Sequence, residues 1–179
     1  MIFEASNGDW SKGKIAIDDI MLMDWSNECQ VLPRDAVPWG CNFEQDTCKW
    51  TQSKYGNMAW TRHNGSTSAS DTAPTVDHTT NTSKGYYMNM EASYPAVENG
   101  TAALISGFVK GYGNNTITRY CMSFAYYMKG SNSDKLQVKL KPQNESDSAA
   151  IWQRVGSQGP DWKHTEVQLV IMEDTQVLN

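Results

Sequence analysis

Five acidic side chains from three separate stretches of the chain have the chemistry of a binding site for a hard metal ion. They are Glu44 and Asp46 in a short segment between two cysteines, Asp77 in a long polar stretch, and Asp18 and Asp19 side by side near the start. Ca²⁺ takes several carboxylate and carbonyl oxygens as ligands. If the three stretches meet in the fold, we expect these oxygens to converge on a Ca²⁺ ion. In the alternative interpretation, Asp77 and Asp19 cap turns or pair with Arg62 or a lysine.

The cysteines offer a second kind of chemistry. None of the four stands in a Cys-x-x-Cys pair, so they fit two disulfides better than a zinc site. Cys41 and Cys48 enclose a small acidic loop, and Trp50 follows closely. We expect a Cys41–Cys48 disulfide that clips this turn against the start of a hydrophobic sheet.

Five Asn-x-Ser/Thr sequons favour a secreted or extracellular, glycosylated chain, because this number in a surface rich in Ser, Thr and Asn is a stronger observation than one sequon. The acceptor residues are Asn64, Asn81, Asn99, Asn114 and Asn144. Met1 is followed by Ile-Phe-Glu-Ala, which is not a signal peptide. If the protein is exported, we expect that this is not its natural start.

Other classes of function find little support in the sequence. The three histidines, His63, His78 and His164, belong to no catalytic motif that we recognise, so we expect no enzyme. The net charge of -5 and the scattered basic residues argue against nucleic acid as a partner. No apolar run approaches the length of a membrane span, so we expect no membrane insertion by this chain.

Hydrophobic periodicity predicts an all-β fold. In 121–128, the large side chains Met122, Phe124, Tyr126 and Met128 share one face, and 135–140 alternates apolar and polar residues. Further strands are expected at 2–5, 85–90, 102–105, 151–155 and 167–171. No helical stripe of useful length occurs, and short strands with long connections predict a β-sandwich of the jelly-roll type.

The segment 14–22 is a strand whose apolar phase changes part-way. Ile15 and Ile17 lie on one face of a regular strand, whereas Ile20 and Leu22 fall on the other. One extra residue at Asp18-Asp19 would restore a common face, so we predict a β-bulge there.

Several motifs, in order, resemble the MAM domain, an extracellular adhesion module named after meprin, the A5 antigen and receptor phosphatase mu. They are Cys41 to Trp50, Trp60-Thr61-Arg62, Asp77-His78-Thr79, Gly85-Tyr86-Tyr87-Met88, Ala103-Leu104-Ile105-Ser106, Cys121 to Met128 and Trp162-Lys163. The resemblance implies a jelly-roll sandwich, a non-catalytic role and a long-range disulfide between Cys29 and Cys121. Some MAM-like domains carry a cation in a place comparable to the acidic set above.

The resemblance holds in rotated order. Phe3-Glu4-Ala5, Gly13 to Ile20 and Cys29 are similar to the closing strands of the family, although they precede the body. We therefore divide the chain into closing strands at 1–29, a Pro-containing linker at 30–40 and the domain body at 41–179.

Three interpretations of this order are open. The chain is one repeat of a tandem array or filament whose residues 1–29 complete a neighbouring unit, or a circular permutation that completes its own domain, or a fragment with a dangling tail. The third would leave open sheet edges and an open core. We favour the repeat, because tandem modules are familiar in the family that the chain resembles and Met1 does not begin an export signal. Strand exchange between units would make a filament, since a head-to-tail contact that does not close propagates.

The expected function is therefore that of an extracellular structural or adhesive module that associates with copies of itself. The alternative is a ligand- or carbohydrate-binding accessory module of a larger extracellular enzyme or receptor. Seven tryptophans invite the carbohydrate interpretation. Trp50, Trp60, Trp152 and Trp162 lie where strands begin or alternate, so we expect them in core packing instead.

Overall fold

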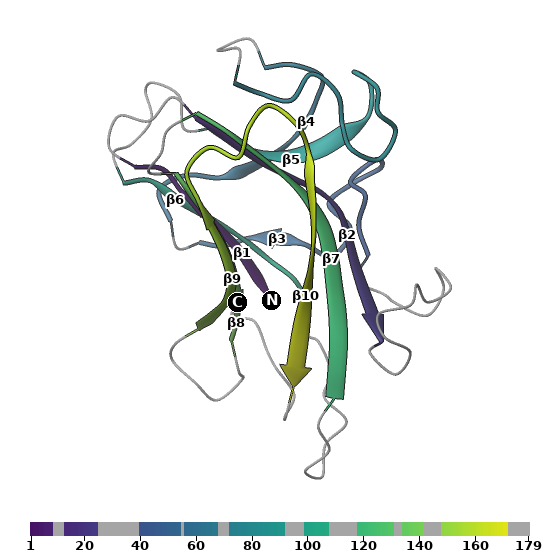
Figure 1. Cartoon of the computed structure of the whole chain (residues 1–179), viewed down its shortest axis with the longest axis vertical. Helices are drawn as coiled ribbons and strands as arrows, with labels where there is room; N and C mark the ends of the chain where they lie inside the picture. The colour runs from purple at the N-terminus through teal and green to yellow at the C-terminus, as the bar shows by residue number, and fades with distance from the viewer. Residues whose placement is uncertain are drawn as a thin grey trace.

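Ten β-strands and no helix make up the part of the chain that the structure, a computed structural model, describes (Figure 1). The described residues are 1–8, 13–24, 40–54, 56–67, 72–91, 99–107, 118–130, 134–141 and 148–171. The strands are β1 (Ile2–Ser6), β2 (Lys14–Asp24), β3 (Thr51–Gln52), β4 (Trp60–Asn64), β5 (Tyr86–Glu91), β6 (Thr101–Ile105), β7 (Thr118–Lys129), β8 (Lys135–Leu140), β9 (Ala149–Val155) and β10 (Lys163–Ile171). Within these ranges there is accordingly no helix that could cross a membrane.

The strands form two five-stranded antiparallel sheets that pack face to face. One has the order β3-β6-β1-β8-β9 and the other the order β10-β7-β2-β5-β4. The inner faces of the two sheets together enclose one large hydrophobic cluster. The all-β jelly-roll sandwich expected from the sequence is confirmed.

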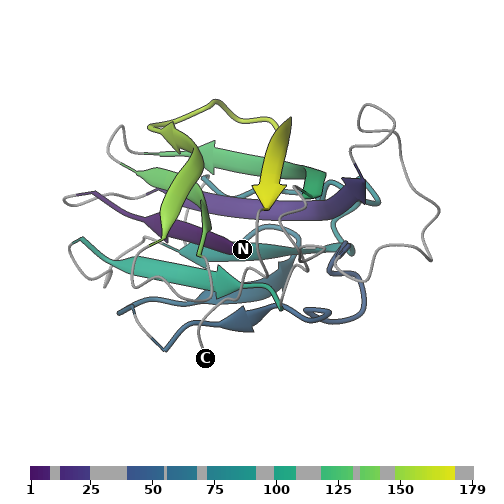
Figure 2. The same ribbon diagram turned by 90° about the horizontal axis from the view of Figure 1, so that it is seen from below.

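The two N-terminal strands occupy the middle of the two sheets, one strand in each. β1 pairs with β6 on one side and β8 on the other, with Phe3 opposite Leu104 and Val138. β2 pairs in the same way with β5 and β7. Figure 2 shows both purple strands enclosed by strands from later in the chain. The described part of residues 1–29 is thus integral to the sandwich and does not dangle.

Aromatic side chains fill the centre of the core. The Phe3 ring lies 5.4 Å from that of Trp50 and 4.9 Å from that of Phe124, and the Phe124 ring lies 5.1 Å from that of Trp152. The face of β7 predicted from its period of two points inward, since Met122, Phe124, Tyr126 and Met128 all belong to the core cluster. Trp60 is also buried there.

The predicted bulge in β2 is confirmed. Asp18 pairs with Ala125 and Met21 pairs with Ser123, so β2 contains one residue more than β7 over this interval. Asp19 adopts a positive φ of 49°, the left-handed conformation in which Asp is better tolerated than most residues. The bulge brings Ile15, Ile17, Ile20 and Leu22 into the same core cluster.

Some features depart from the sequence-based expectations. Strands β3 and β4 were not expected. Gln137, predicted to point outward with the other polar residues of 135–140, is buried, and its side-chain amide donates to the Gln153 side chain on β9. The stripe Val167, Leu169 and Ile171 faces the core as predicted. Except for Gly40, the linker predicted at 30–40 lies outside the described residues.

Replacing Phe3 with Ala tests whether the N-terminal strand completes this core. Phe3 is fully buried between two aromatic rings, so we expect Phe3→Ala to lower the free energy of unfolding by about 3–5 kcal/mol in urea denaturation. Val155→Ala is the control, because its side chain is 53% exposed and its loss should change stability by less than about 0.5 kcal/mol. Equal stabilities of the two variants would contradict the central position of β1.

Candidate functional site

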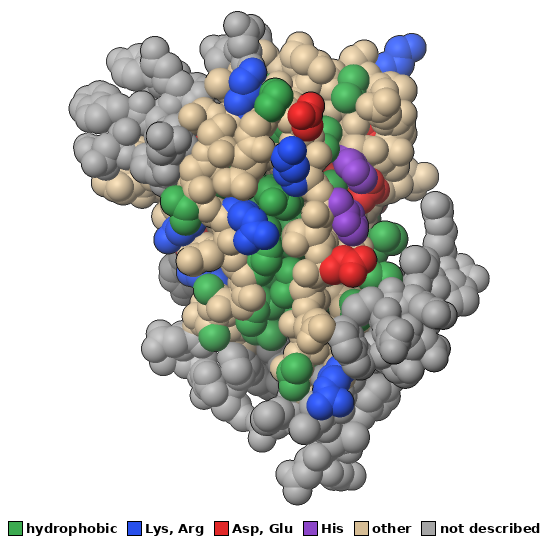
Figure 3. Space-filling model, viewed as in Figure 1, with side chains coloured by type: hydrophobic (Ala, Val, Ile, Leu, Met, Phe, Trp, Pro, Cys, Tyr) green, Lys and Arg blue, Asp and Glu red, His purple; other side chains and the backbone are tan. Residues whose placement is uncertain are grey.

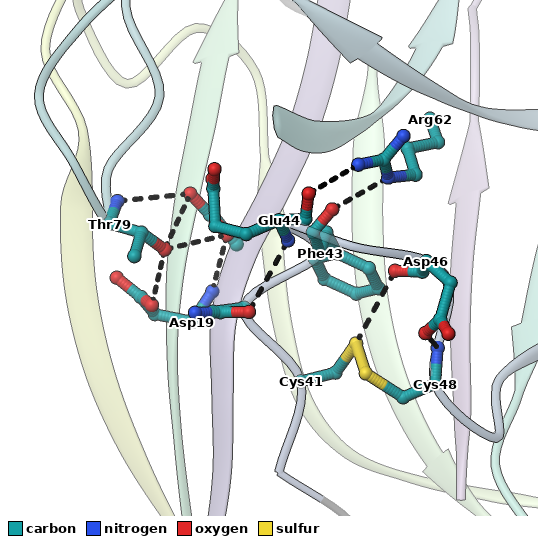
Figure 4. Close-up of a disulfide and its surroundings, with 10 residues drawn as sticks. Asp19, Cys41, Phe43, Glu44, Asp46, Cys48, Arg62 and Thr79 are labelled. Carbon is teal, nitrogen blue, oxygen red and sulfur yellow. Dashed lines mark hydrogen bonds between the residues drawn. A yellow bond between two sulfur atoms is a disulfide. The ribbon is translucent and has the colours of Figure 1, made fainter. Parts of the chain in front are cut away.

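The turn between Cys41 and Cys48 is clipped by the predicted disulfide, with sulfur atoms 2.11 Å apart. We call residues 41–48 the clipped turn. Cys41 exchanges two backbone hydrogen bonds with Ile20, at 2.8 and 2.9 Å, so the clipped turn begins directly beside the bulge of β2. On its other side, the Arg62 guanidinium donates to the carbonyl oxygens of Phe43 and Glu44, both at 2.6 Å (Figure 4).

The two carboxylates at the bulge bind the loop that follows Asp77. Asp18 is fully buried and accepts hydrogen bonds from the backbone N–H groups of His78 at 2.9 Å and Thr79 at 3.2 Å. Asp19 contacts the same two residues through their side chains, at 2.5 Å from His78 Nδ1 and 2.6 Å from Thr79 Oγ1. The bulge is what allows neighbouring residues of one strand to direct both carboxylates to one loop.

Asp77 organises its own loop from the inside. Its buried carboxylate accepts hydrogen bonds from the Thr80 N–H at 2.5 Å, the Thr80 hydroxyl at 2.7 Å and the Thr82 N–H at 2.9 Å. Gly85 passes so close to this carboxylate that a Cβ added there would collide with it. A glycine is therefore required at Gly85 by the close approach, and Asp77 acts as the turn cap that was one of the two sequence-based alternatives.

Four of the five predicted acidic residues thus bind one short segment, residues 77–86, which we call the docked loop. Asp18, Asp19 and Asp77 bind it as described, and Glu44 accepts a hydrogen bond from the Tyr86 N–H at 2.8 Å. Asp46 is the exception, because its carboxylate accepts from the Cys48 N–H inside the clipped turn. The Arg62 guanidinium donates to backbone carbonyls of the clipped turn rather than to these carboxylates, and it lies 3.5 Å from the centre of the Tyr86 ring.

The calcium prediction therefore stays a prediction. Among the described residues, no three acidic, histidine or cysteine side chains are grouped as a metal ion would require. The carboxylates of Asp18, Asp77 and Glu44 instead accept hydrogen bonds from backbone N–H groups of the docked loop. Buried acidic groups need such donors to offset their loss of water.

Burial and the neighbouring Asp19 charge determine the pKa of the Asp18 carboxyl at the bulge. Burial, assisted by the adjacent Asp19 carboxylate, raises the pKa of Asp18 from its ordinary value of 3.8 to about 7, although three backbone hydrogen bonds act in the opposite direction. For Asp77, burial also acts to raise the pKa, but the hydrogen bonds from Thr80 and Thr82 outweigh it and the pKa is lowered. Near neutral pH the Asp18 carboxyl is consequently close to the midpoint of its titration, whereas the Asp77 carboxyl is ionised.

The remaining predicted site residues are distributed over the surface and the far side of β7. Cys121 is buried and disulfide-bonded, whereas its predicted partner Cys29 lies outside the described residues. Asn64, Asn81 and Asn99 are exposed, as glycosylation requires. The predicted sequons at Asn114 and Asn144 also lie outside the described residues.

The outer face of the β2-β5-β7 sheet carries a second aromatic cluster that the sequence did not predict. It comprises Ala16, Tyr87, Tyr127 and Trp162, which we call the outer aromatic cluster. Trp162 was expected in the main core, but it lies on the opposite face of the sheet, 5.7 Å from the Tyr87 ring and 5.8 Å from the Tyr127 ring. Tyr87 and Tyr127 alternate with inward residues on their strands, and this alternation was the available indication of a second apolar face.

A cavity of about 440 Å³ lies between this cluster and the docked loop. Its walls include Pro74, His78, Asn81, Tyr127, Asp161 and Trp162. Figure 3 shows two histidine side chains, in purple, next to acidic groups, in red, on the face of the molecule that Figure 1 presents.

The profile of the MAM domain family, described as meprin/A5/mu, matches residues 41–178. The chain belongs to the MAM domain family. The clipped turn, the docked loop and strands β3 to β10 all lie within the matched range.

Curated MAM proteins are similar to this chain over most of its length. MAM domain-containing protein 2 of Homo sapiens is 34% identical over 170 residues, which is 94% of this chain and 24% of that protein. MAM domain-containing glycosylphosphatidylinositol anchor protein 1 of Gallus gallus is 33% identical over 135 residues, 72% of this chain and 14% of the relative. The human anchor protein 2 is 28% identical over 148 residues. The chain spans a quarter or less of the length of these relatives.

The raised pKa of Asp18 makes a definite prediction for pH dependence. The folded protein binds this proton more tightly than the unfolded chain, so the free energy of unfolding should fall as the pH rises from about 4 to about 7, by up to about 1.4 kcal/mol per pH unit. Asp18→Asn removes this proton and should flatten the dependence. Urea denaturation of both forms at several pH values, with chelator present, measures the difference. Parallel curves for the two forms would show that Asp18 does not titrate in this range.

The calcium prediction is tested by chelation. We expect Ca²⁺ to raise the thermal midpoint of chelator-treated protein if the acidic groups around the docked loop form its site, and we expect Asp19→Asn to abolish that rise. Differential scanning fluorimetry with and without chelator measures both forms, and Mg²⁺ is the matched control ion. Thermal midpoints equally insensitive to chelator in both forms would remove the calcium prediction.

Proposed function

We propose that this chain is an extracellular adhesion module that associates with copies of itself by sharing its N-terminal strands. The observation that carries the proposal is the central position of β1 and β2. Each pairs on both edges with strands of the body, and Phe3, Ile15 and Ile17 are fully buried. The body alone lacks the middle strand of both sheets, so it requires a donor of these strands.

The linker between the N-terminal strands and the body allows β1 and β2 to pair with the body of their own chain or with that of another copy. β2 ends at Asp24 and the body begins at Cys41, so the backbone of the intervening residues joins the N-terminal strands to the body. In another copy, β1 and β2 would occupy the same positions between the strands of the body. Such an exchange costs little energy, since the contacts are identical. The same sandwich would then form between molecules.

The order of segments in a relative supports a repeated arrangement. The alignment with MAM domain-containing protein 2 covers nearly all of this chain, so it includes most of residues 1–29 together with the body. That relative therefore contains a closing segment in front of a body, in the order found here. In a tandem array, each body has one closing segment before it and another after it, and either segment could supply the middle strands of its sheets.

An extracellular position has independent support. Disulfides persist in oxidising compartments, and the clipped turn contains one. Two relatives are named as glycosylphosphatidylinositol anchor proteins, and no relative reported above is an enzyme by name.

The side of the sandwich between β9 and β10 supplies a further contact surface for association. Figure 3 shows a strip of hydrophobic side chains between these two edge strands. Val155 on β9 and Val170 on β10 are 53% and 48% exposed. Edge strands with exposed apolar groups favour pairing with another chain.

Refolding at different concentrations tests strand sharing. Closure within one chain does not depend on protein concentration, whereas exchange between chains does. Because a short linker gives an effective concentration on the order of millimolar, we expect monomers after oxidative refolding at about 1 µM and oligomers near 1 mM. Light scattering measures the mass, and non-reducing electrophoresis detects chains joined through Cys29 and Cys121.

The control variant is Cys29→Ser, which removes the predicted covalent link and leaves Cys41–Cys48 intact. It should give oligomers of the same mass by light scattering but no ladder on the non-reducing gel. A wild-type chain that remains monomeric at every concentration would contradict the proposed self-association.

A further inference from the structure

The cavity beside Trp162 has the size and the wall chemistry of a carbohydrate site. Its volume of about 440 Å³ lies within the range of roughly 300–1,000 Å³ that is usual for small-ligand sites. Trp162 and Tyr127 provide aromatic surface, while Asp161 and His78 provide polar groups at the same walls. Sugar rings combine apolar C–H faces, which pack on the negative face of an aromatic ring, with hydroxyls that donate to carboxylates.

The aromatic wall is held rigidly in place. Trp162 is only partly buried, and its Nε1–H donates to the Val76 carbonyl at 2.9 Å. The indole also contacts the rings of His78, Tyr87 and Tyr127, at centroid distances between 5.7 and 6.0 Å. A ring fixed on several sides loses little conformational entropy when a ligand packs against it.

A glycosylation acceptor stands on the rim of this cavity. Asn81 is exposed, lines the cavity and opens the sequon Asn81-Thr82-Ser83. Its two neighbours, Thr80 and Thr82, both donate to the buried Asp77 carboxylate, and the Asp77 N–H donates to the Thr82 carbonyl at 3.1 Å. The attachment point is therefore fixed relative to the cavity, which neither Asn64 nor Asn99 lines.

We propose that the cavity beside Trp162 binds the N-linked glycan that is attached to Asn81 of the same molecule. The first N-acetylglucosamine packs against the indole, and Asp161 accepts hydrogen bonds from its hydroxyls. A single sugar residue binds a protein weakly, but covalent attachment at the rim gives it a high effective concentration at the site. The glycan then stabilises the docked loop and covers the outer aromatic cluster.

The test uses the full chain secreted from cells that make N-glycans. Ser83→Ala removes the sequon and leaves the Asn81 side chain in place, and Asn64→Gln removes a glycan whose attachment residue does not line the cavity. Mass spectrometry should find Asn81 occupied. We expect Ser83→Ala to lower the Tm by roughly 2–4 °C and to raise amide exchange in residues 72–91, while Asn64→Gln changes neither.

A contact-specific readout separates packing on Trp162 from a general effect of glycosylation. In NMR spectra, the ring current of the indole should shift the N-acetyl methyl resonance of the Asn81-linked sugar upfield from that of the Asn64-linked sugar. Endoglycosidase trimming to one N-acetylglucosamine should preserve the shift and the Tm. Trp162→Phe should abolish the shift, and if that variant does not fold, the comparison of the two wild-type resonances still decides.

Three results would overturn the proposal. The first is an unoccupied Asn81 in the secreted chain. The second is an Asn81-linked sugar whose N-acetyl resonance equals that of the Asn64-linked sugar. The third is binding of free diacetylchitobiose at Trp162 by the fully glycosylated chain, because the cavity would then be open to a carbohydrate from another molecule.

Discussion

The whole arrangement depends on the extra residue in β2. Without it, either Ile15 and Ile17 or Ile20 and Leu22 would face away from the core, because side chains in a strand alternate. The same irregularity turns Asp18 and Asp19 to one side and places Ile20 beside Cys41. One backbone device therefore serves three purposes: it closes the core, anchors the clipped turn and holds the docked loop.

The docked loop shows how buried charge can define a conformation. Asp18 and Asp77 are fully buried, and each is surrounded by N–H and hydroxyl donors from the loop. Removing a carboxylate from water is costly, so these side chains favour the one loop conformation that supplies their donors. The His78 ring of the loop lies 6.0 Å from the indole ring of Trp162, and the Val76 carbonyl just before the loop accepts a hydrogen bond from Trp162 Nε1–H. The outer aromatic cluster is consequently covered by a loop that acidic groups position.

Features that depend on the periodicity of one strand could be predicted from the sequence, whereas contacts between segments distant in the chain could not. The bulge was predictable because four apolar residues changed phase within a single strand, and the inward face of β7 followed from its alternation. The partners of Asp18 and Asp19 were not predictable, since His78 and Thr79 are remote in the chain and meet the bulge only through sheet pairing. The face on which Trp162 packs was not predictable, because a tryptophan beside a strand can pack on either side of a sheet; it lies with Tyr87 and Tyr127 on the outer face.

The different positions of the first and last described strands have a mechanical consequence. β1 is held by hydrogen bonds to both neighbours along its length, whereas in the described part of the chain β10 is an edge strand that pairs with β7 alone. A force along β1 acts in shear on its backbone hydrogen bonds to both β6 and β8 at once. A force that peels β10 from β7 breaks the hydrogen bonds between them one after another. Separation of β10 is therefore the easier of the two, and it leaves β1 paired on both sides, because β1 belongs to the other sheet.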